Sequence, residues 1–215
     1  MAHRGVLFLD ELPEFQKSTL ELLRGPLEDR KITISRLNTA ITYPCSFMFV
    51  ASMNPCPCGY YGAKDKTCNC KPEQIKKYIH KVSGPLLDRI DIQVEVEAVQ
   101  YQKLGYQKQE ESSKQIQNRV NQARKIQLKR YKPYSIYSNE QLTPKLIEKY
   151  CKLDTEAKRM LENAFERLGL SARAYHRILK VARTISDLEG SKNIQTAHLA
   201  EAIQYRSLDR KYWGK

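Results

Sequence analysis

Apolar and polar positions follow two different patterns along this 215-residue chain. Early in the chain, GVLFL (residues 5–9) and FMFVA (47–51) are short, continuous apolar runs, the pattern of strands buried in a parallel sheet. A third run, residues 90–96, predicts another strand. Residues 31–44 alternate instead, with Leu-Asn at their middle, and predict a β-hairpin.

Between these predicted strands, the apolar positions recur with the periodicity of helices. Pro13 stands where a proline often opens a helix, and the apolar positions after it reach Leu27. Residues 73–82 predict a second helix, which the SGP sequence at 83–85 should break. One more helical turn is expected at 86–89.

Beyond residue 99 the strand signal ends and only helical stripes follow. We predict helices over four ranges: 112–130, 155–168, 172–189 and 196–205. The expected fold class is therefore α/β plus all-α. Its parts are an α/β region at 1–99, a polar linker at 100–111 and a helical region at 112–215.

Composition narrows the environment and the partners. The chain has 37 lysines and arginines against 24 acidic residues, a formal net charge of +13, which favours polyanionic partners, nucleic acid first. No apolar run approaches the ~20 residues that cross a membrane, and the N-terminus lacks the pattern of a signal peptide. We therefore expect a cytoplasmic protein.

Acidic and amide side chains follow the first two apolar runs. Asp10 and Glu11 come directly after the run at 5–9, and Asn54 comes shortly after the run at 47–51. Open α/β sheets bind ligands at the carboxyl ends of their strands, where an Asp can hold Mg²⁺ and an adjacent Glu can deprotonate water. The alternative is two solvated acids that begin the next helix, and a turn asparagine.

Five segments occur in the order found in one ATPase family: GVLFLDELPEF, ISRLNTAITYP, ASMNPCPCG, SGPLLDRIDI and LSARAYHRILKVARTISDLEGS. Over nearly its whole length the chain resembles the magnesium-chelatase-like AAA+ ATPases. Within them it is most similar to the ComM/YifB branch, bacterial proteins tied to DNA processing in natural transformation. The resemblance implies a partial P-loop core, with a parallel sheet and a pre-sensor-1 hairpin, followed by a helical lid bundle.

The family pattern implies a role for each matching residue. Asp10 corresponds to the Walker B aspartate that binds Mg²⁺, Glu11 to the catalytic base and Asn54 to sensor 1. Arg89 corresponds to the arginine finger, because a planar, permanently charged fork can bridge the phosphoryl oxygens of a neighbouring subunit's ATP. Arg173 corresponds to sensor 2 in the lid. Without the family pattern, Arg89 could pair with a neighbouring aspartate, and Arg173 could be one cation of a basic helix.

The same resemblance implies a homo-hexameric ring that uses ATP and Mg²⁺ and acts on DNA. In related motors the hairpin matching residues 31–44 points at the central pore. A helicase or branch-migration motor is the leading hypothesis. Two alternatives stay open: a zinc-stabilised DNA-binding module without ATPase activity, and a chelatase-type subunit that inserts Mg²⁺ into a porphyrin. The cysteine pattern of residues 54–70 argues against the chelatase.

One family motif is missing from the 215 residues. The sequence GxxxxGK[ST], whose backbone N–H groups and lysine hold the phosphates, does not occur. The chain begins only a few residues before the Walker-B-like segment. We expect it to be the C-terminal portion of a family protein, and we expect this polypeptide alone neither to hydrolyse ATP nor to bind it tightly.

Four of the six cysteines form two Cys-x-Cys pairs within residues 54–70: Cys56, Cys58, Cys68 and Cys70. Four thiolates can hold a tetrahedral Zn²⁺. Reduced thiols without a ligand and two disulfides are the alternatives. We interpret the cluster as a structural staple on the loop that leaves Asn54. The two other cysteines, Cys45 and Cys151, are typical of small core residues.

The predicted helix at 112–130 is basic on one side. Six lysines and arginines and no acid lie between residues 112 and 131, while Ile116, Val120 and Ala123 recur at helical spacing. One face should therefore pack against the rest of the helical region. The other face is either simply solvated or in contact with backbone phosphates.

Overall fold

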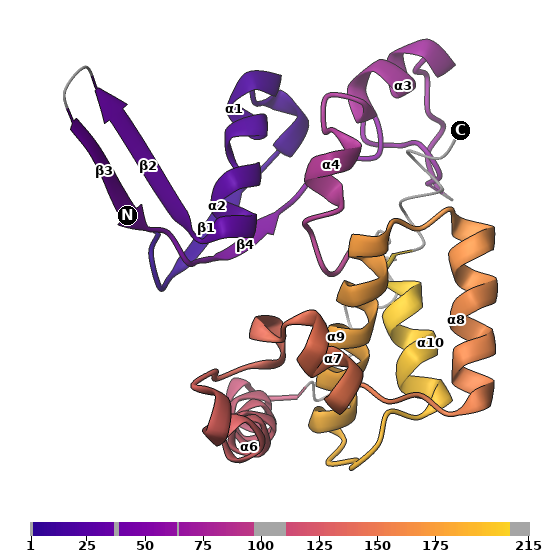
Figure 1. The fold of residues 1–215 in the computed structure, drawn as a ribbon. Helices are drawn as coiled ribbons and strands as arrows, with labels where there is room; N and C mark the ends of the chain where they lie inside the picture. Colours follow the sequence, from indigo (N-terminus) through magenta and orange to yellow (C-terminus); the bar gives the residue numbers. More distant parts are fainter. Residues whose placement is uncertain (1, 37–38, 64, 97–110, 207–215) are drawn as a thin grey trace. The chain divides into compact units, whose positions relative to one another are not determined.

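The structure is a computed structural model that describes residues 2–36, 39–63, 65–96 and 111–206. It divides into two compact units, residues 2–90 and 91–206 of the described chain (Figure 1). The first is a mixed α/β unit with a parallel pair of strands, and the second is helical, which confirms the predicted fold class. The linker predicted at 100–111 lies outside the described residues, except for Glu111. Among the described helices, none is long and apolar enough to cross a membrane.

The first unit alternates short strands and short helices along the chain. Its elements are, in order, β1 (Val6–Leu9), η1 (Leu12–Glu14), α1 (Lys17–Leu22), α2 (Arg24–Asp29), β2 (Lys31–Arg36), β3 (Thr39–Pro44), β4 (Met48–Ala51), α3 (Pro72–Ile79) and α4 (Gly84–Leu87).

The parallel pair β1–β4 forms the base of this unit. The register pairs Val6 with Met48 and Leu9 with Ala51. One face of the pair packs on a small core, which contains Leu12, Leu20, Val82, Leu86 and Leu87. The other face is exposed, so the expectation that both strands are fully buried is wrong. The reason is that no described element covers that face, whose members are Val6, Phe8, Met48 and Val50.

The predicted hairpin is confirmed. Strands β2 and β3 pair antiparallel, with Ile34 opposite Ile41. The hydroxyls of Thr33 and Thr42 are hydrogen bonded at 2.9 Å across the ladder. Both strands are exposed on both faces and extend away from the helices of their unit (Figure 1). The turn at residues 37–38 lies outside the described residues.

Helix boundaries in the first unit differ from those predicted. Pro13 opens only a 3₁₀ turn, because the extended backbone of Phe15 ends it before α1 begins. The last helix starts at Gly84 rather than 86, because the Ser83 side chain caps it and a proline fits its first turn. The third strand predicted at 90–96 is wrong. Gln93 N–H donates to the Tyr205 carbonyl at 3.0 Å, so this segment bonds to the end of a helix of the second unit instead.

The second unit consists of helices joined by short turns. Its elements are α6 (Ser113–Tyr131), η2 (Lys132–Tyr134), η3 (Asn139–Gln141), α7 (Pro144–Tyr150), α8 (Thr155–Leu168), α9 (Ala172–Leu188) and α10 (Thr196–Gln204). The four predicted helices are all present within two residues of their predicted ends. Helix α7 was not predicted.

Helix α9 is the centre of this unit. It packs against α6, α7 and α10, and α10 also packs against α8 (Figure 1). Ile178, Leu179 and Ala182 of α9 are buried in the main core, together with Leu161 of α8 and Leu199 of α10. The 3.6-residue stripes of the sequence thus become one bundle core.

Candidate functional site

Asp10 stands directly after β1, at the carboxyl edge of the parallel pair. The ladder continues past the strand ends, because Ser52 N–H donates to the Leu9 carbonyl at 3.0 Å. The Ser52 hydroxyl then donates to Asp10 Oδ1. Asp10 is exposed, so this carboxylate is oriented by Ser52 while it stays accessible to a cation. Ser52 was not singled out from the sequence, where a serine after a strand carries no distinct signal.

Glu11 has an unusual backbone conformation. Its φ and ψ angles are 51° and 50°, in the left-handed region that a residue with a side chain rarely adopts. Its N–H donates to Asp10 Oδ1 at 3.0 Å, and the Glu11 side chain is exposed. The strained turn places two carboxylates in succession at one sheet edge, and such strain is often found at functional sites.

Asn54 follows the end of β4, at the same carboxyl edge of the parallel pair as Asp10. Its backbone N–H is bonded to the Tyr78 hydroxyl, and its side chain lies beside Gly59, where an added Cβ would touch it at 3.9 Å. Burial, followed by the negative charges of Glu14 and Glu11, raises the pKa of Tyr78. Leu12 N–H donates to the Ser52 carbonyl at 2.9 Å, so the structure brings the acidic turn next to the segment that leads from β4 to Asn54.

Arg89 is buried within the first unit. Its side chain is only 7% exposed, and it forms an ion pair with Glu28. Its Nη1 also donates to the Pro85 carbonyl at 2.7 Å. In the single chain the guanidinium is thus directed into its own unit. Glu28 was not anticipated, because a partner 61 residues away leaves no local pattern in the sequence.

Arg173 belongs to the second unit and lies in the first turn of α9. The helix is capped by Ser171, whose hydroxyl accepts from Ala174 N–H at 3.2 Å. Arg173 itself is exposed.

The four cysteine sulfurs come together in one cluster. Their Sγ atoms all lie within 4.8 Å of one another, with Cys56–Cys58 at 3.4 Å, Cys58–Cys68 at 3.6 Å and Cys56–Cys68 at 3.7 Å. A disulfide needs about 2.05 Å, so these are free thiols. Tetrahedral zinc with Zn–S near 2.3 Å would place sulfur pairs ~3.8 Å apart. The cluster therefore fits a four-thiolate metal ion.

Backbone N–H groups point at these sulfurs, as the hydrogen-bond donors around metal ligands do in metal centres. Tyr61 N–H donates to Cys56 Sγ at 3.3 Å. The Tyr60 backbone hydrogen bond is the main cause that lowers the pKa of Cys58 to about 6. The Cys70 backbone donates to Cys68 and favours its thiolate, but burial and the neighbouring thiols outweigh it and raise the pKa of Cys68 to about 12. Adjacent thiols resist ionising together unless a cation compensates their charge.

Comparisons with known proteins match the chain to two family models in succession. Residues 1–104 match the family "Magnesium chelatase, subunit ChlI", and residues 110–206 match "Magnesium chelatase, subunit ChlI C-terminal". The chain is 46% identical over 212 residues to competence protein ComM of Haemophilus influenzae. It is 44% identical over 211 residues to YifB of Escherichia coli and 36% identical over 205 residues to Rv2897c of Mycobacterium tuberculosis.

These matches cover nearly all of the chain but only part of each relative. They include 98%, 98% and 95% of this chain, respectively, and 40% of each of the three relatives. The chain thus spans about 40% of the length of these relatives, in their C-terminal portion.

Proposed function

Because this chain belongs to the magnesium chelatase ChlI family, we propose that it is the C-terminal part of a ring-forming ATPase that acts on DNA. The observation that supports this most directly is the carboxyl edge of β1–β4. There Asp10, oriented by Ser52, and Glu11 stand next to the segment that leads from β4 to Asn54, in a chain of this family. One relative is named competence protein ComM, which supports a role in DNA uptake or recombination.

Each residue at this edge has a separate role in ATP hydrolysis. We assign Mg²⁺ binding to Asp10, whose exposed carboxylate suits a hard cation. Glu11 orients the attacking water and accepts its proton. The side-chain amide of Asn54 positions the γ-phosphate or that water. When bound, Mg²⁺ neutralises charge on the phosphate oxygens. The loop that holds the phosphates is supplied by polypeptide outside these 215 residues.

The ring follows from the role proposed for Arg89. A finger that acts on the ATP of a neighbouring subunit makes hydrolysis depend on assembly, and cyclic closure gives each subunit one such neighbour. In this proposal Arg89 leaves Glu28 when subunits meet. Arg173 contributes as sensor 2 from the helical unit. The assembled hexamer would move DNA as a helicase or branch-migration motor.

Zinc is the structural cofactor in this proposal. Cys56, Cys58, Cys68 and Cys70 hold it, which fixes the loop between Asn54 and α3. That loop carries two glycines with positive φ, Gly59 and Gly62, and otherwise little regular structure. The metal thus stabilises the sensor side of the nucleotide site without taking part in the reaction.

A chimera tests the ATPase. The C-terminal portion of Haemophilus influenzae ComM is replaced by this chain, and ATP turnover is measured with and without DNA. Turnover is expected, and Glu11→Gln should lower it by about 100-fold or more, because a general base contributes on that scale. Glu73→Gln, at an exposed position on α3, is the matched control and should leave turnover unchanged.

Mixing variants tests the ring. Chimeras with Glu11→Gln and Arg89→Ala are each inactive if both roles are right. Mixed rings should regain part of the activity, because some interfaces then combine an intact Glu11 with an intact Arg89. A folded chimera that hydrolyses no ATP would instead favour the second candidate, a zinc-stabilised DNA-binding module, for which the four-cysteine cluster is the specific observation.

A further inference from the structure

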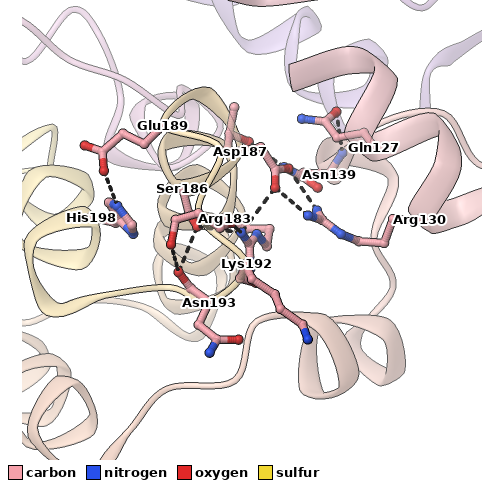
Figure 2. A network of polar contacts seen from close by, with 12 residues as sticks. Gln127, Arg130, Asn139, Arg183, Ser186, Asp187, Glu189, Lys192, Asn193 and His198 are labelled. Atoms are coloured by element: carbon pink, nitrogen blue, oxygen red, sulfur yellow. Dashed lines mark hydrogen bonds and ion pairs between the residues drawn. The ribbon is translucent and has the colours of Figure 1, made fainter. Parts of the chain in front are cut away.

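Helix α6 is held to its unit by one narrow face. Only Ala123, Gln127 and Tyr131 are buried along its 19 residues. Gln127 accepts from the Asn139 backbone N–H at 3.4 Å, and the Tyr131 hydroxyl donates to the Asn139 side chain at 2.7 Å. The neighbouring Arg130 reaches Asp187 on α9 with both terminal nitrogens (Figure 2).

The basic charge of this unit is concentrated on that helix. Residues 111–206 contain 19 lysines and arginines against 10 acids, and α6 alone holds six of these cations and no acid. Two of the six are paired, Arg119 with Glu111 and Arg130 with Asp187. The other four form no ion pair with a described residue: Lys114, Arg124, Lys125 and Lys129.

The face opposite the buried one carries lysines and amides without an apolar residue. At about 100° per residue, six exposed residues share an arc of about 100° centred opposite Ala123, Gln127 and Tyr131. We call this the outer face of α6, and it consists of Lys114, Asn118, Asn121, Gln122, Lys125 and Lys129. The nearby Leu128 and Ile126 lie outside this arc, one on each side.

Spacing along the helix suits a row of phosphates. Lys114 and Lys129 are 15 positions apart, or ~22 Å at 1.5 Å per residue. That length matches about six phosphates of one strand at 3.4 Å each along the duplex axis. Between the lysines, Asn118, Asn121 and Gln122 line a hollow of about 410 Å³ together with Arg124, Lys125 and, at its border, Leu128. Amide N–H groups are common donors to phosphate and sugar oxygens.

We infer that the outer face of α6 is a nucleic-acid contact that binds the phosphate backbone without reading sequence. This deepens the proposed function, on which it rests for the choice of DNA as partner. The buried contacts of Arg130, Gln127 and Tyr131 position the helix, while the lysines supply the charge. Because the site is built within one unit, it should bind without nucleotide and without a ring.

The same features disfavour an anionic membrane as the partner. Helices that lie on membranes bury a broad apolar face beside their cations. On α6, the residues between the cations of the outer face are amides, which prefer hydrogen-bond partners to hydrocarbon. A polyanion whose charges stand in a row along one strand is the better match.

The test is DNA binding by the 215-residue chain in the absence of ATP. Anisotropy of a fluorescein-labelled duplex and of a single strand, each about 20 nucleotides long, is followed across a potassium chloride series. Each lost phosphate contact lowers the slope of log Kd against log salt by about 0.9. The triple variant Lys114→Gln, Lys125→Gln, Lys129→Gln should therefore lower the slope by about 2.7 and raise Kd by about tenfold or more at physiological salt.

A charge-matched variant separates the outer face from overall charge. Lys145→Gln, Lys152→Gln, Lys158→Gln removes three exposed lysines elsewhere in the same unit and should change the slope by less than one contact. Far-UV circular dichroism confirms that both variants are folded. Equal changes in the salt slope and in the Kd for DNA in the two variants would overturn the inference. Binding to phosphatidylserine vesicles without binding to DNA would also overturn it.

The outcomes also separate this inference from the proposed function. If the chimera hydrolyses ATP but the outer-face variant binds DNA like wild type, the inference fails and the ATPase assignment stands. If the outer face binds DNA but the chimera never hydrolyses ATP, the inference stands and the motor is refuted.

Discussion

Arg130 of α6 and Asp187 of α9 form a two-point ion pair, with Nη2–Oδ1 at 2.5 Å and Nη1–Oδ2 at 2.9 Å. Asp187 is completely buried, and its Oδ1 also lies 3.2 Å from Nη2 of Arg183. One carboxylate thus faces two guanidinium groups, and Asn139 Nδ2 donates to it at 2.9 Å (Figure 2). The Asp187 interaction raises the pKa of Arg130 despite its burial, so the charged pair is retained.

Loss of this carboxylate should weaken the helical unit strongly. Asp187→Asn keeps the shape of the side chain but leaves two arginines in the interior without their counter-charge. Breaking a buried pair in this way costs about 3–5 kcal/mol. Urea unfolding followed at 222 nm measures the loss. Glu162→Gln, at an exposed position on α8, removes the same charge and should change stability by less than 0.5 kcal/mol or so. Similar losses in both variants would contradict a special role for Asp187.

Zinc should be present in the purified chain without added metal. Elemental analysis is expected to find about one zinc per chain, as four thiolates require. Cys56→Ser should abolish it, because Cys56 is the buried member of the cluster, while Cys45→Ser, outside the cluster, should retain it. A chelator should then release the metal and expose the cluster thiols to alkylation. A zinc content far below one, in folded protein, would refute the site.

The buried thiol of Cys151 should make the helical unit sensitive to alkali. Burial raises its pKa from the ordinary 9.0 to about 11. The folded chain holds this proton more tightly than the unfolded chain, so the stabilisation is intact below about pH 9 and is lost as the pH rises through about 11. Between about pH 8 and about pH 10.5, wild type should lose roughly 2 kcal/mol more stability than Cys151→Ala. Parallel pH profiles of the two proteins would contradict this.

The uncovered face of β1–β4 should make the isolated chain self-associate. Parallel strands are usually covered on both faces, yet Phe8 is 57% and Met48 64% exposed here. Phe8→Lys should therefore lower the binding of an apolar dye and reduce association in sedimentation velocity. Leu22→Lys tests a single apolar side chain on α1, 76% exposed, and should have little effect. An equal response to both substitutions would show that the sheet face has no special role.

Several features of the fold were predictable because they depend on neighbours in sequence. The hairpin β2–β3 and four helices of the second unit follow from patterns of two or 3.6 residues, which record which face of an element is covered, whereas β1 follows from a short continuous apolar run. The strand predicted at 90–96 failed for the converse reason. Its apolar residues Ile92 and Val94 are half exposed or more, and an apolar run by itself does not say whether a partner strand is in reach.

The residues of the candidate site also fall into two groups, those that the sequence revealed and those that it did not. The four cysteines and the pair Asp10–Glu11 were visible in the sequence, because they are close together along the chain. The partners Ser52 for Asp10, Glu28 for Arg89 and Asp187 for Arg130 were not, since each lies more than 40 residues from the group it contacts.

By itself, the sequence determined the family, most of the order of elements and the kinds of chemistry the chain can carry, because these depend on residue types in a fixed order. Only the tertiary structure decided which side chains are free to act. It buried Arg89 against Glu28, left Asp10 open to a cation, and joined the four sulfurs in one cluster. It also turned the lysines of α6 outward, because Arg130 is bound to a carboxylate that the chain brings close only by folding.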